Sequence, residues 1–418
     1  MTSSRFELPK VTLSYPEDVF SISSHPSEPV VAAGLSTGHV YVRRYAVDES
    51  DGFDDNNDLG FKGVKNGGSQ SMHDLTELWK TRRHKGSCRG VIFDEDGDCL
   101  YSVGTDLVLK QASSETGKVT AKNTTDLDSE PSALAITKNN ILVGTESGSL
   151  QVFDPRIATA VSKFENLHDD YVTSVTHLAQ YQNTNQFITT GSTTVTRVDI
   201  RKGKLSTSED QEDEILSSCI SYPAYFEYDN TRHGGISPNK RVPVTAVMGM
   251  STGVLTFWTK SNWEDQQSRA ILSDESLDCV MEYPDERVVV AGADGFVRLV
   301  DVRKRKTALE LNHGGEDGVV DLAVDASGRI ISGGGTTVKI WTVDGTSNIE
   351  EVVVDDMDTD NRDSSASDAG SDDSDDSDDE DKKKKKKRKI KKRKRGKAKN
   401  RITAKNSAKS RPNFAGLD

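Results

Sequence analysis

Two short segments of the sequence carry the spacing of a nucleophilic serine, Gly-x-Ser-x-Gly. They read GLSTG at 34–38 and GMSTG at 249–253. In hydrolases this motif lies on a sharp turn between a strand and a helix, where the serine hydroxyl can attack an acyl carbon. Here both motifs are followed by strand-like segments, HVYVRRY and VLTFW. Because a tight hairpin turn also requires glycine, we interpret both motifs as turns and predict no catalytic residue.

Histidines and cysteines are the other residues that could do chemistry. The eight histidines are scattered, and the four cysteines, Cys88, Cys99, Cys219 and Cys279, are far apart. Zinc sites and disulfide frameworks need closely spaced or regularly patterned ligands, so we predict no metal ligand and no disulfide. The sequence also has neither a phosphate-binding Gly-x-x-x-x-Gly-Lys loop nor a His-Glu-x-x-His motif. We therefore expect no cofactor and no enzymatic activity.

A dense basic run in the C-terminal part could bind nucleic acid. The segment 382–401 reads KKKKKKRKIKKRKRGKAKNR and has 16 basic residues in 20 positions. Such runs act as nuclear targeting signals, and they neutralise phosphates without reading the base sequence. We predict nuclear and nucleolar targeting and a non-specific RNA contact for Lys382, Lys383, Lys384, Lys385, Lys386, Lys387, Arg388, Lys389, Lys391, Lys392, Arg393, Lys394 and Arg395.

An acidic block precedes the basic run. The stretch 355–381 has 14 acidic residues against Arg362 alone. Low hydrophobicity and self-repulsion predict disorder for the acidic, serine-rich segment 352–381, and the same holds for the basic tail 382–418. Serines among these acids are candidate sites for acid-directed kinases, namely Ser365, Ser371, Ser374 and Ser377. Each phosphate would add about −1.5 to −2 to an existing negative field.

The rest of the chain repeats one unit, a short apolar strand that ends in glycine, a tight polar turn and an alternating strand. It reads NILVGTESGSLQVFD at 140–154 and VVVAGADGFVRLVD at 288–301. Seven such units share a marker glycine, namely Gly34, Gly104, Gly144, Gly191, Gly249, Gly292 and Gly333. Most intervals are near the ~40–45 residue period of a four-stranded propeller blade. Insertions of loop composition, at about 47–74 and 222–242, explain the two longest. We predict an all-β, seven-bladed β-propeller over 1–351.

Each blade also needs a strand before the glycine unit. Seven apolar segments lie in the required places, at 19–23, 88–93, 132–136, 172–178, 215–220, 277–283 and 319–324. The ring must also close, because an open propeller leaves two unpaired sheet edges. The outermost strand of the last blade could be VTLSY at 11–15 or IEEVVV at 349–354, and the sequence does not decide between them.

These repeats resemble the WD-repeat family. In that family a histidine in the loop that enters a blade packs with an aspartate in a tight turn, and a Trp-Asp pair ends the third strand. The loop histidine is matched here by His84, His168 and His313. The aspartate of the pair is kept by Asp154, Asp199 and Asp301, and the tryptophan by Trp258 and Trp341. The resemblance implies a structural role for these residues.

The layout of the whole chain is similar to the WD repeat-containing protein 55 family and its fungal counterpart, the nucleolar Jip-type proteins. Seven weak repeats are followed by an acidic serine-rich block and a Lys/Arg block. The resemblance implies a non-catalytic interaction scaffold in the nucleus and nucleolus, with a role in ribosomal RNA processing and ribosome biogenesis. Pre-ribosomal assembly factors would then bind the propeller faces. We expect a monomeric propeller within a larger assembly and no membrane partner.

Two other functions remain open. The Asp-x-Arg sequences at 154–156, 199–201 and 301–303 resemble the ending by which some WD-repeat proteins dock to the adaptor of a cullin-type ubiquitin ligase. The docking arginines of such a substrate receptor would be Arg156, Arg201 and Arg303. The segment 1–351 also has 52 acidic against 34 basic residues, so the propeller could instead attract basic partners such as histones on chromatin.

Overall fold

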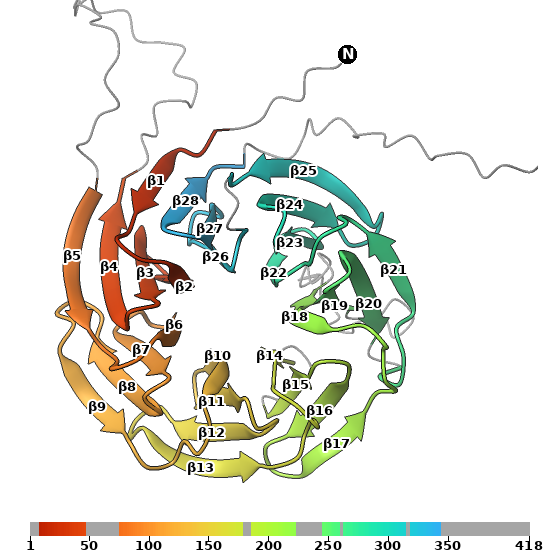
Figure 1. Ribbon diagram of the computed structural model, residues 1–418, viewed down its shortest axis with the longest axis horizontal. Helices are drawn as coiled ribbons and strands as arrows, with labels where there is room; N and C mark the ends of the chain where they lie inside the picture. The colour runs from red at the N-terminus through yellow and green to blue at the C-terminus, as the bar shows by residue number, and fades with distance from the viewer. Residues whose placement is uncertain are drawn as a thin grey trace, which may run out of the picture. The chain divides into compact units, whose positions relative to one another are not determined.

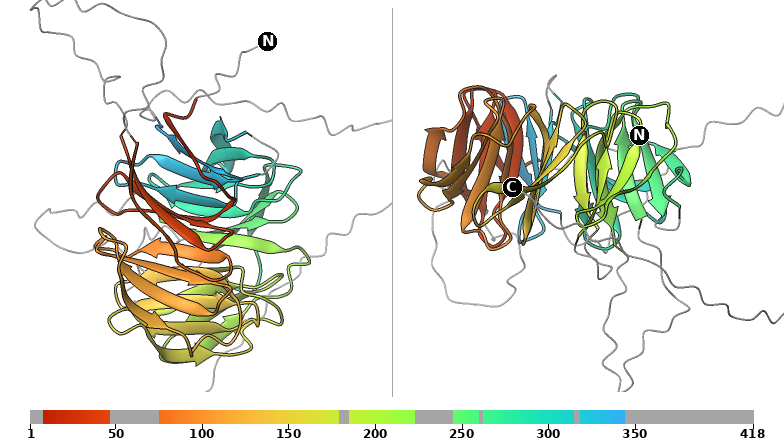
Figure 2. Two further views of the ribbon diagram at one scale, coloured as in Figure 1. Left: turned by 60° about the vertical axis from the view of Figure 1, so that its left-hand side comes forward. Right: turned by 90° about the horizontal axis from the view of Figure 1, so that it is seen from below.

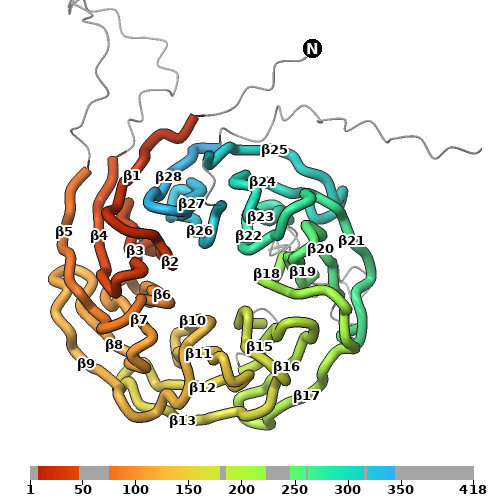
Figure 3. The backbone as a smooth tube through the Cα atoms, in the orientation of Figure 1, coloured from red at the N-terminus to blue at the C-terminus, as the bar shows by residue number. Residues whose placement is uncertain are grey.

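The computed structural model describes residues 8–46, 75–178, 185–222, 245–259, 262–314 and 318–343. In this part of the chain 28 strands form seven sheets, each of four antiparallel strands. Figure 1 shows these sheets as blades around a central axis, and the tube in Figure 3 follows the chain from blade to blade in sequence order. The prediction of an all-β, seven-bladed propeller is confirmed.

In six blades the four strands follow one another in the chain, from the axis outward. Blades 1 to 3 contain β2 (Val19–Ser24), β3 (Val30–Leu35), β4 (His39–Tyr45) and β5 (Leu75–Arg82); β6 (Cys88–Phe93), β7 (Cys99–Gly104), β8 (Val108–Ser113) and β9 (Val119–Asn123); and β10 (Pro131–Thr137), β11 (Asn140–Thr145), β12 (Leu150–Asp154) and β13 (Thr159–Phe164). Blades 4 to 6 contain β14 (Ser174–His177), β15 (Gln186–Thr190), β16 (Val195–Asp199) and β17 (Gly203–Thr207); β18 (Ile215–Ser221), β19 (Thr245–Met250), β20 (Val254–Thr259) and β21 (Ser268–Ile271); and β22 (Cys279–Tyr283), β23 (Arg287–Ala291), β24 (Phe296–Asp301) and β25 (Lys306–Asn312).

The glycine units form the second and third strands of the blades, as the repeat predicts. The second strands are buried on both faces, because each blade packs between two neighbours; in β3 all six residues are buried. Their sequences are accordingly nearly continuous apolar runs rather than clean alternations. The outermost strands face solvent, and β5 is exposed at most of its positions.

The two faces of the ring carry different loops, as the views in Figure 2 help to follow. We call the face on which the innermost strands begin the upper face. It carries the connections between blades and the turns between second and third strands. Backbone hydrogen bonds join these two kinds of loop: the Ser36 N–H donates to the Asp18 carbonyl (2.9 Å) and the His84 N–H to the Gly38 carbonyl (3.0 Å). The lower face carries the other turns of each blade.

The ring closes through the N-terminal strand. Blade 7 contains β26 (Asp321–Val324), β27 (Ile330–Gly334) and β28 (Thr337–Trp341), and its outermost strand is β1 (Val11–Ser14). The antiparallel register pairs Val11 with Ile340 and Leu13 with Val338. Of the two candidates left open by the sequence, 11–15 therefore closes the ring, and 349–354 lies outside the described residues.

Side chains of blade 1 hold the closing strand in place. The Arg43 guanidinium donates to the Ser14 carbonyl at 2.8 Å and lies 4.3 Å above the ring centroid of Tyr15. On the lower face, the Tyr45 hydroxyl donates to Asp325 of blade 7 at 2.8 Å. Hydrogen bonds to charged groups and cation–π contacts are among the stronger non-covalent contacts, so both faces stabilise the junction of blades 7 and 1.

Hydroxyl and carboxylate side chains link the innermost strands of adjacent blades. The Ser21 hydroxyl accepts the Val91 N–H at 3.2 Å, and the Ser217 hydroxyl accepts the Val280 N–H at 2.9 Å. At the junction of blades 7 and 1 a carboxylate takes this role, and Asp321 accepts the Ile22 N–H at 2.7 Å. The innermost strand is the inner edge of each sheet and has no strand beside it on the axial side. These side chains therefore accept N–H groups that would otherwise lack a hydrogen-bond partner.

The marker glycines are required by the close approach of neighbouring segments. A Cβ atom on Gly34 would lie 2.8 Å from the Cys88 Sγ of blade 2, and one on Gly144 would lie 2.6 Å from a Val172 methyl group of the next connection. On Gly292 the added atom would overlap the carbonyl oxygen of Ser276. None of these three glycines has a positive φ, so the spacing between blades, rather than turn geometry, excludes a side chain.

Replacing two marker glycines with alanine should have unequal effects. In Gly292→Ala the new methyl group meets backbone, which cannot move aside, and we expect unfolding to become easier by about 1–3 kcal/mol. In Gly333→Ala the nearest atom is the Cγ2 methyl of Ile22, at 3.0 Å, and the next nearest atoms also belong to side chains, so the new methyl group meets no backbone. Urea denaturation of both variants measures the difference. Equal losses would contradict the assignment of Gly292 to a backbone contact.

Candidate functional site

The three loop histidines lie on the upper face and are buried. Each donates its backbone N–H to the last glycine of a turn in the preceding blade, as His168 does to Gly148 and His313 to Gly295. Burial lowers the pKa of His84, and it lowers the pKa of His168 and of His313 to about 4. All three rings are therefore neutral at pH 7.

The partners of the three rings differ. His84 Nδ1 lies 2.8 Å from Asp106 and its Nε2 lies 3.0 Å from the Ser102 hydroxyl, which is the His–Asp arrangement that the resemblance implies. His168 instead has the hydroxyls of Thr194 and Thr189, at 2.8 and 2.9 Å. Only the first of these two rings therefore has a carboxylate partner.

The third histidine connects to a buried tryptophan. His313 Nδ1 lies 2.8 Å from the Ser332 hydroxyl, and the Trp341 indole N–H donates to the same oxygen at 2.9 Å. Trp258 donates to Thr256 on its own strand, at 3.1 Å. Both tryptophans are almost fully buried, so each indole places a large apolar side chain in the core and satisfies its N–H.

A fourth position of this kind was missed in the sequence. The Ser273 N–H donates to Gly253 as the histidines do to their glycines, and its hydroxyl donates to Asp294 at 2.6 Å. Asp294 also pairs with buried Arg298, at 2.7 Å. The signal was present in the spacing, because Asp294 follows Gly292 by two residues just as Asp106 follows Gly104. A search for histidine alone could not find it.

The three aspartates after the third strands form turns on the lower face. Asp154, Asp199 and Asp301 each accept a backbone N–H two residues later, in all three cases at 2.9 Å. This bond is typical of Asx-turns, in which the side chain mimics a backbone turn. It fixes the connection between the third and fourth strands.

The residues that donate these bonds are the three candidate docking arginines. The Arg156 side chain is 84% exposed and pairs with the adjacent Asp154, which it holds at a pKa of about 2. Arg303 pairs with Glu286, and Arg201 is exposed. The structure therefore places the three guanidinium groups on equivalent turns of blades 3, 4 and 6, two of them with an intramolecular partner.

The two Gly-x-Ser-x-Gly segments are hairpin turns between β3 and β4 and between β19 and β20. Gly38 and Gly253 have positive φ angles of 79° and 78°, which only glycine adopts without strain. The Ser251 hydroxyl donates to Asp213 at 2.8 Å. Strands follow both turns, so neither has the strand-to-helix geometry of a nucleophilic serine.

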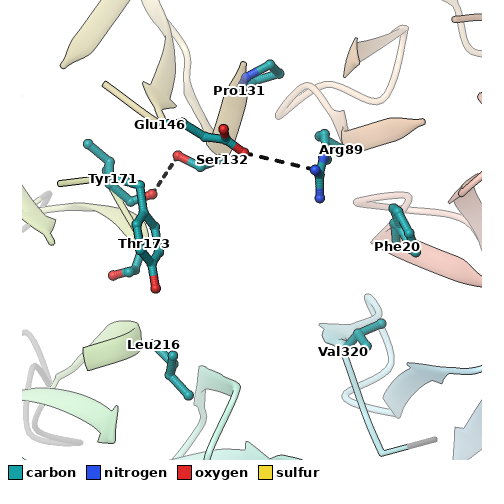
Figure 4. Close-up of a pocket in the computed structure, with 10 residues that line it drawn as sticks. Phe20, Arg89, Pro131, Ser132, Glu146, Tyr171, Thr173, Leu216 and Val320 are labelled. Atoms are coloured by element: carbon teal, nitrogen blue, oxygen red, sulfur yellow. Dashed lines mark hydrogen bonds and ion pairs between the residues drawn. The ribbon is translucent and has the colours of Figure 1, made fainter. Parts of the chain in front are cut away.

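An axial pocket of about 560 Å³ opens among the first residues of the innermost strands. Its walls come from six blades and consist of Phe20, Arg89, Pro131, Ser132, Glu146, Tyr171, Val172, Thr173, Leu216 and Val320. In Figure 4, Phe20, Leu216 and Val320 lie across the opening from Glu146. No sequence motif marks this site, because residues 300 positions apart in the chain meet only in the closed ring.

The charged groups of the axial pocket are loosely paired. Arg89 lies 3.7 Å from Glu130 and 4.0 Å from Glu146, and these three side chains are between 41 and 50% exposed. The Tyr171 hydroxyl donates to Glu214 at the other side of the pocket. Exposed ion pairs at such distances contribute little stability, so the carboxylates can exchange partners.

The remaining sequence predictions fall outside the described residues. They are the insertion at 47–74, nearly all of that at 222–242, the serines at 365–377 and the basic run 382–395. Within the described ranges, no group of histidine, cysteine or acidic side chains has the arrangement of a metal site. The same ranges contain no helix of membrane-spanning length and hydropathy.

Comparison with known proteins identifies relatives over most of the chain, although no family model matches it. The chain is 36% identical over 359 residues to WD repeat-containing protein JIP5 of Coccidioides immitis, covering 79% of this chain and 80% of that protein. It is 35% identical over 357 residues to the jip5 protein of Emericella nidulans, covering 79% and 83%. Among solved structures, the WD40 β-propeller domain of Doa1 matches with a TM-score of 0.58 at 12% identity, over 80% of this chain and 96% of that one.

Proposed function

Because the chain belongs to the JIP5 family of WD repeat-containing proteins, we propose that it is a non-catalytic interaction scaffold that acts in ribosomal RNA processing and ribosome biogenesis in the nucleolus. The WD-repeat propeller is the scaffold. The finer assignment rests on the similarity of its layout to the WD repeat-containing protein 55 family. In this proposal the propeller binds pre-ribosomal assembly factors, and the basic run contacts pre-ribosomal RNA.

The axial pocket is the observation that carries a binding role for the propeller. Six blades contribute to its walls, and half-exposed apolar and charged side chains meet there. Pockets of 300–1,000 Å³ with apolar walls and a few polar groups are common binding sites. Because this pocket forms only in the closed ring, it is consistent with a fold whose role is to bind partner proteins.

The basic run supports an RNA contact. Its 16 basic residues in 20 positions can neutralise several phosphates, which gives a salt-sensitive affinity without sequence preference. No aromatic residue interrupts the run, so base stacking would add nothing. Specificity for pre-ribosomal particles would therefore have to come from protein contacts on the propeller.

Crosslinking and sequencing of RNA bound to the tagged protein in cells tests this function. We expect pre-ribosomal RNA from the full chain, and at least about tenfold less from a full-length variant in which every Lys and Arg of 382–395 is glutamine, since each lost phosphate contact weakens binding. Tagged protein should also localise to the nucleolus. Glutamine at Lys122, on the outermost strand β9, and at Lys118, which directly precedes it, serves as the control.

Failure to recover ribosomal RNA from either protein would contradict the nucleolar role. The substrate receptor of a cullin-type ligase then becomes the leading candidate, since Arg156, Arg201 and Arg303 lie on equivalent lower-face turns. Co-purification of the ligase adaptor, lost on charge reversal of the three arginines, would identify it. Salt-sensitive capture of histones would instead identify a chromatin-binding propeller.

A further inference from the structure

We propose that the upper face binds an extended lysine- and arginine-rich segment of a partner protein, with one basic side chain in the axial pocket. The inference rests on the proposed scaffold function and names the chemistry of its partner. Three observations support it: the charge of the upper-face loops, the two unlike walls of the pocket, and the position of Arg89.

The connections on the upper face are strongly acidic. The connection 208–214 reads SEDQEDE, and the connections 124–130, 165–173 and 272–278 each hold three carboxylates. Among the described connections between blades, only Arg83 and Lys85 are basic. The lower-face turns are mixed: 155–158, 200–202 and 302–305 contribute arginines and lysines, whereas 94–98 is acidic. The two faces therefore differ in charge, and the upper face attracts cations.

The axial pocket offers the two surfaces that a basic side chain needs. Lysine and arginine have an apolar stem and a charged end. Phe20 and Val320 are 37 and 42% exposed, and together with Leu216 they form an apolar wall for the stem. Glu146, which lines the pocket in Figure 4, and Glu130, which lies 3.7 Å from the lining residue Arg89, offer carboxylates for the charged end. A carboxylate cluster alone would attract any cation, whereas the apolar wall favours a long aliphatic stem.

The side chain of Arg89 already places a guanidinium group in the axial pocket. Its side chain lies between Glu130 and Glu146, and the guanidinium carbon is 5.9 Å from the ring centroid of Phe20. The pairing is loose, so an arriving arginine or lysine can take over these carboxylates while Arg89 moves into solvent. Arg89 thus acts as a weak internal competitor of the partner. RNA is disfavoured on this face, because the same carboxylates repel phosphate.

The test measures binding of a fluorescein-labelled nonapeptide of alternating lysine and arginine to the full chain by fluorescence anisotropy. The variant with Glu130→Gln and Glu146→Gln should bind at least about tenfold more weakly, as expected when about 1.4 kcal/mol is lost. Phe20→Ala should weaken binding several-fold. Arg89→Ala should strengthen it about two- to fivefold, because the internal competitor is gone. The acidic segment 355–381 is present in every variant, so peptide bound there adds the same background to each titration.

A matched control removes the same charge from the lower face. The variant with Asp96→Asn and Glu115→Gln changes two exposed carboxylates there and should bind the peptide as the unchanged protein does. Equal weakening of both double variants, or weaker binding by Arg89→Ala, would overturn the proposal. So would a dependence of oligouridine binding on Glu130 and Glu146, which would assign the pocket to RNA.

This test can fail without the proposed function failing. Loss of the peptide effect would leave the scaffold role intact, since partners could bind other surfaces. Failure of the scaffold role itself would appear as absence of pre-ribosomal RNA in the crosslinking experiment. Circular dichroism and thermal unfolding of each variant confirm that the propeller is folded.

Discussion

Leu13→Ala is expected to lower the free energy of unfolding of the propeller by about 2–5 kcal/mol, the usual range for a fully buried leucine. Leu13 has no exposed surface and lies in the cluster that joins blades 7 and 1, opposite Val338. The substitution removes apolar surface and leaves a cavity in the one blade built from both ends of the propeller. Urea denaturation followed by tryptophan fluorescence measures the loss.

Thr12→Ala is the matched control for this experiment. Thr12 is the neighbour of Leu13 on the same strand, but its side chain is exposed, so we expect a change below about 0.5 kcal/mol. Deletion of residues 1–14 should be more severe than Leu13→Ala, since it also removes the hydrogen bonds to β28 and the contact of Arg43 with Ser14. A deletion that leaves stability unchanged would show that β1 does not close the ring.

Acidification from pH 7 to pH 5 is expected to reduce the contribution that His168 and His313 make to the stability of the propeller. Burial lowers the pKa of both rings to about 4, whereas an unfolded histidine has its ordinary value of about 6.5. Between these values the unfolded chain binds more protons than the folded one, so stability is full above about pH 6.5 and falls as the pH drops toward 4. A difference in proton binding of one proton changes the free energy of unfolding by about 1.36 kcal/mol per pH unit. Between its unfolded pKa and pH 5, each histidine therefore lowers the free energy of unfolding by about 2 kcal/mol.

Asp321 opposes part of this loss. Burial raises its pKa to about 6, so the folded state binds the extra proton between about pH 3.8 and 6. Its contribution is therefore present at low pH and is lost as the pH rises through 6. Between pH 7 and 5 this returns about 1.4 kcal/mol. Glu282, whose pKa is raised to about 7 by desolvation, opposes the histidines over the same pH range. The prediction therefore concerns the contribution of the two histidines, which their variants isolate, and not the sign of the net change.

Non-titrating variants separate these contributions. His168→Gln should be less stable at pH 7, because it disturbs the bonds to Thr189 and Thr194, but its further loss between pH 7 and 5 should be smaller by about 2 kcal/mol. Adding His313→Gln should remove a similar amount again. Urea denaturation of the three proteins at both pH values gives the comparison. Parallel losses in all three would mean that these rings do not control the acid response.

The sequence was sufficient for the blades because each blade repeats a local pattern. The glycine units and the apolar segments before them correspond to strands in all seven blades, since strand, turn and strand are neighbours in the chain. The requirement for glycine at the marker positions could not be predicted in the same way, because it comes from contacts with the neighbouring blade. Gly34, for example, is excluded from carrying a side chain by Cys88 of the next blade, and only the spacing between blades reveals that.

The candidate site depended on contacts that no local pattern contains. Phe20, Arg89 and Val320 have no motif in common, and they meet at one opening because the innermost strands of different blades begin on the same face. The loop histidines could be found from their type, but their partners could not. Asp106 is replaced by Thr194 beside His168, and a serine replaces the histidine itself at position 273.

The pairing of β1 with β28 can form only after nearly the whole propeller has been synthesised, which affects folding on the ribosome. About 320 residues lie between the two strands, and at roughly 5–20 residues per second a ribosome needs on the order of 15 s to a minute to synthesise them. During that time Leu13 and the edge of β1 have no partner, and blade 1 lacks its neighbour on one side. A strand that waits with an apolar side chain and unpaired N–H groups is prone to wrong pairing. We therefore expect the nascent chain to depend on chaperones until blade 7 has left the ribosome.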